Sequence, residues 1–288
     1  MTSPGTARRL WALGEPFHGL TYFAAEARAA AEAAGVRGFW SGYFAMRAAP
    51  LGPVGPEVVT ATFFGFAPAF VRRRVPAVWD AVPPAGALGA RLAGVDAAVR
   101  RVLGEGWPDS PDAAEAAELA GAAAAAVDVP GRPLAAANAG LPVPGRPHLA
   151  LWQALTTLRE HRGDGHNAAL LQRGVSGLAA NVLAVAAGRT DRDWLLRARG
   201  WTEAEWDDAA AALADRGWLA GDGGLTAEGL AVVTAVETDT DRLALGPWHS
   251  LGDTRCDRLA ELLVPVRRAV VTAGDWPAGN PIGAPDPT

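Results

Sequence analysis

The chain has 288 residues, enough for one large or two ordinary domains, and half of them are apolar. Its formal net charge of −5 disfavours a general affinity for nucleic acid or anionic membrane, because both need clustered positive charge. All 26 basic residues are arginine, which excludes a Schiff-base or P-loop lysine, and the single cysteine, Cys256, excludes intrachain disulfides and multi-thiolate metal sites.

The N-terminal sequence MTSPGTARRLWALGEP lacks the apolar core of a secretory signal. The longest apolar run, Val58 to Val71, contains threonines and a proline and is too short to span a bilayer. We therefore expect a cytoplasmic protein without a membrane partner.

Helical patterns dominate the first half of the chain. Thr6 can cap a helix over 7–15, which Pro16 is expected to bend or end. Further helices are predicted over 22–35, 37–49, 56–66, 84–104 and 110–127, the last of them opened by Ser110. The Pro/Gly-rich stretch 129–148 that follows is either a domain boundary or an ordered crossing loop.

The C-terminal part has the order of a winged helix-turn-helix. Short helices are predicted over 191–200 and from Trp201, with Thr202 and Glu205 spaced as a capping box. Two short strands then flank the turn 222–224, and Thr226 caps a helix over 227–245. The sequence thus predicts a mostly α fold, in which an N-terminal helical domain packs on a winged helix-turn-helix domain with a small β-hairpin wing. The expected bounds are 1–130 for the helical domain, 131–148 for the linker or crossing loop, 149–273 for the winged helix and 274–288 for a flexible tail.

Two resemblances accompany this order. The run DRGWL…DGGLTAEG resembles the recognition helix and wing of winged-helix regulators of the MarR type. The blocks EPFHGLTYF, GFWSGYFAMRAAPLGPVGPE and REHRGDGH resemble those of an actinobacterial helix-turn-helix family of unassigned function, over Arg8 to about Trp248. The resemblance implies the fold and a possible regulator role, but it implies no reaction.

The segment in the recognition position is acidic. Residues 203–216 contain five carboxylates against one basic residue, Arg216. DNA binding needs arginine or lysine at phosphates and base edges, although Arg192, Arg197 and Arg199 just before this segment could contact phosphates. We expect that the fold is kept and DNA binding is lost, with a MarR-like transcription regulator as an alternative.

A polar cluster, REHRGDGH, interrupts an otherwise apolar helix. Leu151, Leu155 and Leu158 define a buried stripe that continues at the helical period to Arg162 and His166. A buried arginine needs a negatively charged partner. In one interpretation Arg162 forms a structural ion pair between the domains and a backbone carbonyl satisfies His166. In the other, Arg162 holds the acid group of a ligand and His166 donates a hydrogen bond or moves a proton.

A third interpretation is a metal site. Gly163 and Gly165 could kink the helix and bring together Glu160, His161, Asp164 and His166, although Glu160 and Asp164 project from the opposite side of a straight helix. This ligand set would suit zinc, iron or manganese, but its spacing matches no standard helical metal motif.

Candidate partners of this cluster lie in the N-terminal half. If the helix continues past Pro16, Glu15 and His18 share a face, so that Glu15 could neutralise Arg162; otherwise both are solvated at a helix end. Arg47 follows Tyr43 by four residues at a nominally buried position. The surrounding aromatic residues either belong to the core or floor a cavity for a flat acidic ligand such as haem: Trp40, Tyr43, Phe44, Phe63, Phe64 and Phe66.

The first functional hypothesis is a binding protein that holds a small anionic, largely apolar molecule between the two domains. Its expected ligand contacts are Arg162, Arg47, Glu15, Tyr43 and Trp40, with the histidines His166 and His18. The second is a metal- or haem-dependent enzyme in which His166 or His18 acts as acid, base or ligand. The sequence does not decide whether the chain forms a homodimer.

Overall fold

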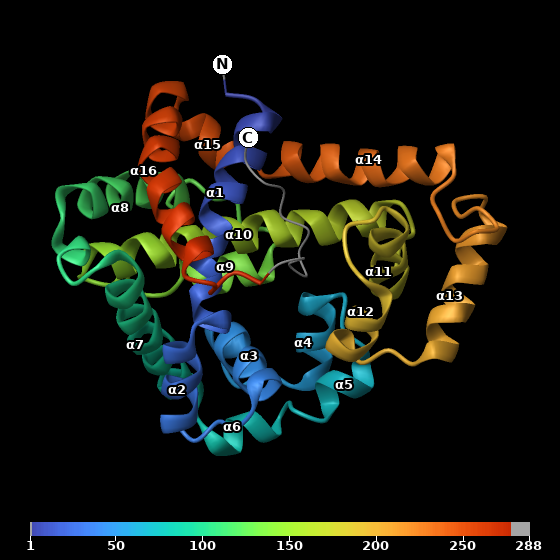
Figure 1. The fold of residues 1–288 in the computed structure, drawn as a ribbon, viewed down its shortest axis with the longest axis horizontal. Helices are drawn as coiled ribbons and strands as arrows, with labels where there is room; N and C mark the ends of the chain where they lie inside the picture. The colour runs from blue at the N-terminus through green and yellow to red at the C-terminus, as the bar shows by residue number, and fades with distance from the viewer. Residues whose placement is uncertain (1, 278–288) are drawn as a thin grey trace.

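The computed structural model describes residues 2–277, and helices account for nearly all of their regular structure (Figure 1). The first half contains α1 (Pro4–Phe23), α2 (Ala25–Ala33), α3 (Phe39–Ala48), η1 (Ala49–Leu51), α4 (Pro56–Phe63), α5 (Pro68–Arg72), α6 (Ala77–Ala81), α7 (Pro84–Leu103), η2 (Trp107–Asp109) and α8 (Pro111–Ala124). The second half contains α9 (Pro133–Ala139), α10 (Pro147–Gln172), α11 (Gly177–Ala186), α12 (Arg192–Arg199), α13 (Glu203–Asp215), α14 (Ala227–Leu243), α15 (Gly246–Leu251) and α16 (Asp253–Thr272).

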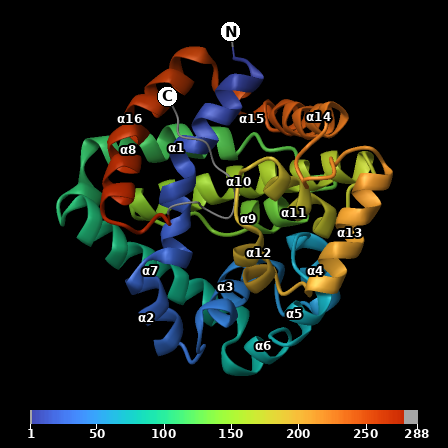
Figure 2. The same cartoon turned by 45° about the vertical axis from the view of Figure 1, so that its right-hand side comes forward.

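The long helix α10 crosses the middle of the molecule, where other helices surround it (Figures 1 and 2). It packs against α1, α7, α8, α9 and α14. Its buried residues therefore lie on every side, and Glu160 and Asp164 are as buried as Arg162. The expectation that Glu160 and Asp164 project away from the buried face is wrong, because neighbouring helices cover both sides of α10 at this level.

Three hydrophobic clusters make up the core. The first joins α1, α7, α8 and α10 to α15 and α16, so the last helix of the chain packs on the first. The second gathers aromatic and aliphatic side chains of α3 to α6, and the third extends from the end of α10 through α11 to α14. The cavity described below lies where elements of the second and third clusters meet α1 and α10.

The mostly α fold is confirmed, but the β-hairpin wing is wrong. Within residues 2–277 no strand forms; between α13 and α14 there is one isolated antiparallel bridge, Leu219 to Leu225. Its hydrogen bonds run from Ala220 N–H to Gly224 O (2.8 Å) and from Thr226 N–H to Trp218 O (3.1 Å). A ladder cannot extend further, because α13 with its terminal turn ends just before this segment and Thr226 already caps α14.

Pro16 does not end the first helix, since α1 continues to Phe23. A proline removes one backbone N–H donor, and here the rest of the helix is buried and held by packing. Glu15 and His18 therefore stay on one helical face. They are almost completely buried rather than solvated at a helix end.

The predicted linker 131–148 contains α9, which packs on α10. The predicted division of the chain near 130 and 149 stays a prediction. Of the expected flexible tail, 278–288 lies outside the described residues. Within 274–277, Asp275 forms an ion pair with Arg101 (2.7 Å) and Trp276 packs on Phe23.

Among the described residues, no single helix is long and apolar enough to cross a membrane. Only α10 and α11 taken together reach the required length and composition, and the chain bends by 94° between them.

Candidate ligand-binding cavity

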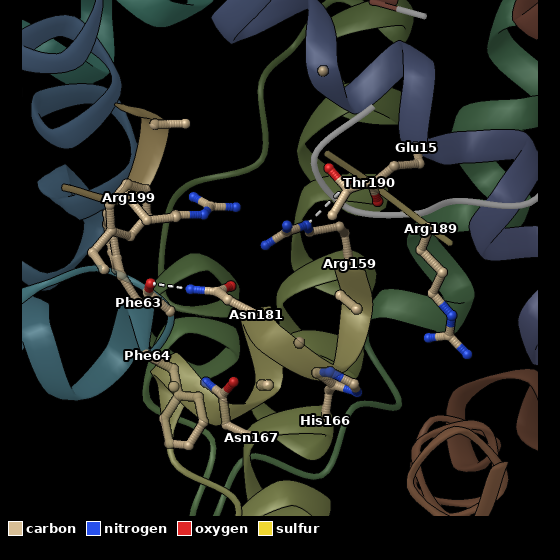
Figure 3. Close-up of a pocket in the computed structure, with 18 of the residues that line it drawn as sticks. Glu15, Phe63, Phe64, Arg159, His166, Asn167, Asn181, Arg189, Thr190 and Arg199 are labelled. Atoms are coloured by element: carbon tan, nitrogen blue, oxygen red, sulfur yellow. Dashed lines mark hydrogen bonds and ion pairs between the residues drawn. The ribbon is translucent and has the colours of Figure 1, made fainter. Parts of the chain in front are cut away.

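A cavity of about 750 Å³ lies between α1, α3 and α4 on one side and α10, α11, α12 and α14 on the other (Figure 3). Its apolar lining is largely aromatic and includes Trp40, Tyr43, Phe63 and Phe66. Its charged lining is dominated by seven arginines: Arg8, Arg47, Arg159, Arg162, Arg189, Arg197 and Arg199. Such a combination of apolar walls and a few convergent polar groups is typical of small-molecule sites.

The predicted catalytic and ligand-binding residues come together here. They are carried by α1, α3 and α10, and all seven line the cavity: Glu15, His18, Trp40, Tyr43, Arg47, Arg162 and His166. Their binding of a ligand stays a prediction, but their convergence from three separate helices is a property of the structure.

Arg162 is neutralised from α14. Its Nη2 donates to Asp241 Oδ1 (2.9 Å) and more weakly to Glu237 Oε2 (3.4 Å), and its guanidinium carbon lies 3.9 Å from the centre of the Trp11 ring. The expected pairing with Glu15 is wrong. Glu15 instead accepts from Trp11 Nε1 (2.7 Å) and Arg159 Nε (3.2 Å). Arg162 thus forms a structural ion pair between α10 and α14 and also lines the cavity.

Arg47 is held by a carboxylate that lies behind the cavity wall. Its Nε and Nη2 donate to the two oxygens of Glu160 at 2.9 and 3.0 Å, and its guanidinium carbon lies 4.3 Å from the centre of the Phe63 ring. Arg159 Nη1 donates to the same carboxylate at 2.9 Å. Burial raises the pKa of Glu160, but the guanidiniums of Arg47 and Arg159 outweigh burial and hold this pKa below its ordinary value.

Two arginines that the sequence did not single out as ligand contacts face each other across the cavity. Figure 3 shows the guanidiniums of Arg159, from α10, and Arg199, from α12, pointing into the same space from opposite walls. Arg199 lies 4.3 Å from the centre of the Phe66 ring and has no carboxylate partner among residues 2–277; its Nε is buried without a hydrogen bond. Burial lowers the pKa of Arg199; the hydroxyl group of Tyr43 opposes this shift, and the nearby charges of Arg47 and Arg159 add to it.

A sequence signal existed for one of this pair. Arg159 follows Leu155 by four residues, so the helical period that identifies Arg162 from Leu158 also places Arg159 inside. For Arg199 no comparable signal exists, because its direction depends on how α12 packs. Its neighbour Gly200 has φ +76°, and a Cβ there would lie 2.2 Å from the Phe70 ring.

The hydrogen bonds of His166 fix its tautomer. The Thr240 hydroxyl donates to Val236 O (2.7 Å), so its oxygen must accept from His166 Nδ1–H (2.9 Å). Burial lowers the pKa of His166 to about 4, and the ring is therefore neutral at pH 7. Nε2 then carries a free lone pair on a ring that lines the cavity.

His18 repeats this arrangement. Thr156 donates to Trp152 O (2.8 Å) and accepts from His18 Nδ1–H (2.9 Å), while Nε2 of His18 is buried without a partner. Burial, helped by the charge of Arg159, keeps the pKa of His18 well below its ordinary value. Both imidazoles are therefore neutral, and their Nε2 atoms can accept a hydrogen bond. The Nε2 atom of His18 is buried, whereas that of His166 is accessible from the cavity.

The residues of the predicted metal set do not converge. Glu160 binds Arg47, Asp164 accepts the Ala135 N–H (2.9 Å), and of the four residues only His166 lines the cavity; His161 is buried elsewhere. The kink that would gather them is missing, since α10 is one continuous helix. Throughout residues 2–277, no group of three or more His, Cys, Asp or Glu residues is placed to hold a metal ion.

Comparison with known proteins gives one match. A family model described as a helix-turn-helix family matches residues 7–277, nearly the whole chain. Neither the curated proteins nor the solved structures contain a significant match to this chain. The match supports a helix-turn-helix family without specifying MarR regulators or an activity.

Proposed function

The chain belongs to a helix-turn-helix family, and from that premise we propose that it binds a small anionic, largely apolar molecule. The ligand would occupy the cavity that has α1, α3 and α4 on one side and α10, α11, α12 and α14 on the other. The observation that carries this proposal is the opposed pair of guanidiniums, Arg159 and Arg199, at the open space of the cavity (Figure 3).

The charges around the cavity favour an anion. Seven arginines line it, and the carboxylates that form ion pairs with them are Glu15, Glu160, Glu237 and Asp241. Arg199 is half-buried and has no such partner among the described residues, and a guanidinium that is partly removed from water is stabilised by a counter-charge. A ligand carboxylate or phosphate between Arg159 and Arg199 would offset that cost with charge-assisted hydrogen bonds.

The rest of the lining favours an apolar ligand body. Trp40, Tyr43, Phe63 and Phe66 contact one another with ring centroids at 5.6 to 6.3 Å and surround the space next to Arg199. Aromatic walls provide a large apolar surface and suit a flat molecule.

The charges of α13 argue against DNA as the partner. Its exposed acids would repel phosphates: Glu203, Glu205, Asp207, Asp208 and Asp215. Of the arginines before it, Arg192 contacts Asp207 (3.3 Å) and Arg199 points into the cavity. The proposal is therefore a helix-turn-helix fold used for ligand binding, with the MarR-like regulator as the alternative that a salt-dependent shift of labelled DNA would favour.

The proposal is tested by thermal unfolding with benzoate and naphthoate as anionic probes and the matching neutral carboxamides as controls. A ligand that binds only the folded state adds about 2.7 kcal/mol at 100 times its Kd, so the acids should raise Tm while the amides should not. Quenching of tryptophan fluorescence gives a second readout, because Trp11, Trp40 and Trp194 line the cavity.

Arg199→Met is the informative variant, and Arg28→Met, at an exposed position of α2, is its matched control. Arg199→Met should fold and lose at least about tenfold in affinity, as expected for a charge-assisted hydrogen bond, while Arg28→Met should bind as the parent does. Equal binding by both variants would contradict the proposal. A coloured or metal-containing preparation would instead favour the enzyme alternative.

A further inference from the structure

Two asparagine side chains on the cavity wall have fixed orientations. Asn181 Nδ2 donates to Gly65 O (2.9 Å), and Asn167 Nδ2 donates to Thr62 O (3.2 Å). A carbonyl oxygen only accepts, so neither amide can flip without losing its hydrogen bond. The Oδ1 atom of each side chain is therefore still able to accept a hydrogen bond, and Figure 3 shows both oxygen atoms turned towards the open space.

A third acceptor lies on the same side of the cavity. His166 is one residue before Asn167 on α10, and Thr240 fixes it with the Nε2 lone pair free. Among residues 2–277, no group donates a hydrogen bond to Asn167 Oδ1, Asn181 Oδ1 or His166 Nε2. Arg159 and Arg199 supply donors, so the polar groups of the cavity fall into a donor set and an acceptor set.

We propose that the ligand is an acid that also carries neutral N–H groups, as in a primary amide, a lactam or a heteroaromatic ring. Its acid group binds Arg159 and Arg199, and its one or two N–H groups bind acceptors of the set Asn167 Oδ1, Asn181 Oδ1 and His166 Nε2. This assignment rests on the function proposed above. The N–H groups are neutral, because seven arginines line the cavity and only four carboxylates of residues 2–277 pair with them, which leaves a positive surplus that disfavours an ammonium group.

The test compares two acids of similar size, terephthalamate and monomethyl terephthalate. Both carry one carboxylate on the same ring, but only the amide has N–H donors. The amide should bind about tenfold more tightly, because a buried acceptor left without a donor is unfavourable. The para isomer of aminomethylbenzoate, which carries an ammonium group, should bind more weakly than the amide.

Variants assign the preference to this wall. His166→Phe and the double variant Asn167→Leu/Asn181→Leu should each reduce the preference for the amide over the ester, while Arg28→Met keeps it. His166→Phe leaves both asparagines in place, so it tests the assignment even if the double variant does not fold. If a folded variant still preferred the amide over the ester to the same extent, the acceptor atom removed by that substitution would not bind the N–H group.

Different results would overturn the acid-binding function and the assignment of the N–H groups. Equal binding of the amide and the ester, or tighter binding of the ester or of the aminomethyl compound, would overturn this inference and leave the acid-binding function standing. Absence of binding by all three acids and by naphthoate would overturn both.

Discussion

At the scale of single residues, buried charged side chains in this protein are stabilised by polar or charged groups from other helices. Glu160 on α10 binds Arg47 on α3, and Arg162 binds Asp241 on α14. Removing one partner of such a pair leaves an uncompensated buried charge, which is far more costly than losing an exposed ion pair. Arg199 is the contrast, because its guanidinium faces the cavity without a carboxylate from the described residues.

Asp164 gives a prediction of the opposite kind, because no cationic side chain of residues 2–277 forms an ion pair with it. It is 5% exposed, and its oxygen accepts the Ala135 N–H (2.9 Å). Burial raises its pKa to about 6, above the value of about 3.9 in an unfolded chain. A raised carboxyl pKa favours the folded state below about pH 4, and this contribution is lost as the pH rises through 6.

Asp164→Asn keeps an acceptor oxygen and removes the charge. We expect the free energy of unfolding to rise by about 2 kcal/mol at pH 7 and to change little at pH 4. Urea unfolding at the two pH values measures the difference. A similar gain at both would show that the charge of Asp164 is not its cause.

At the scale of elements, the two glycines of α10 have different surroundings. A Cβ on Gly165 would lie 2.8 Å from Arg132 Nη1 and 3.3 Å from Leu243 Cβ, because Arg132 crosses here to bind His161 O and Leu243 O. A Cβ on Gly163 would come no closer than 3.6 Å to any atom beyond its chain neighbours and the backbone of its own helix, and Gly163 lines the cavity. One glycine therefore admits a neighbouring side chain, and the other borders open space.

This difference predicts opposite effects of the same substitution. Gly163→Ala should stabilise the protein by up to about 1 kcal/mol, the helix preference of alanine over glycine. Gly165→Ala should destabilise it, since Arg132 must move and its hydrogen bonds to two backbone carbonyls weaken. Thermal unfolding of the two variants side by side makes the comparison, and equal shifts would contradict it.

At the scale of the whole molecule, buried neutral histidines link stability to pH. Burial lowers the pKa of both His161 and His166 to about 4, against about 6.5 in an unfolded chain. For a depressed pKa the stability is fully present above pH 6.5 and is lost as the pH falls towards 4, because the unfolded state binds the protons. Asp164 opposes this trend between about pH 4 and 6.

We therefore expect the free energy of unfolding to fall from pH 6.5 to 4, with up to about 1.4 kcal/mol per pH unit from each buried histidine. His166→Gln should reduce the slope, and His249→Gln, at an exposed position, should not. The measurement is a series of denaturant unfolding curves across this range. An unchanged slope in His166→Gln would show that His166 does not titrate as its burial implies.

The sequence by itself determined many of the helices and several of their ends, but it predicted no helix for α5, α6, α9, α15 and α16. Ser110 caps α8, Thr226 caps α14, and Thr202 with Glu205 forms the expected capping box of α13. Each of these signals depends on groups only three or four residues apart, so a local pattern contains it completely. The helical period likewise sufficed to predict that Arg162 and His166 point inward, and the structure places Arg162 inside the protein and His166 on the wall of the cavity.

Only the tertiary structure decided which groups those side chains meet. It paired Arg162 with Asp241 rather than Glu15, turned Arg199 into the cavity, and left the segment between α13 and α14 too short for the expected wing. The physical reason is the distance along the sequence over which each interaction acts. A cap forms within one helical turn, whereas the partner of a buried charge is chosen by which helices pack together, and that depends on the apolar surface of the entire chain.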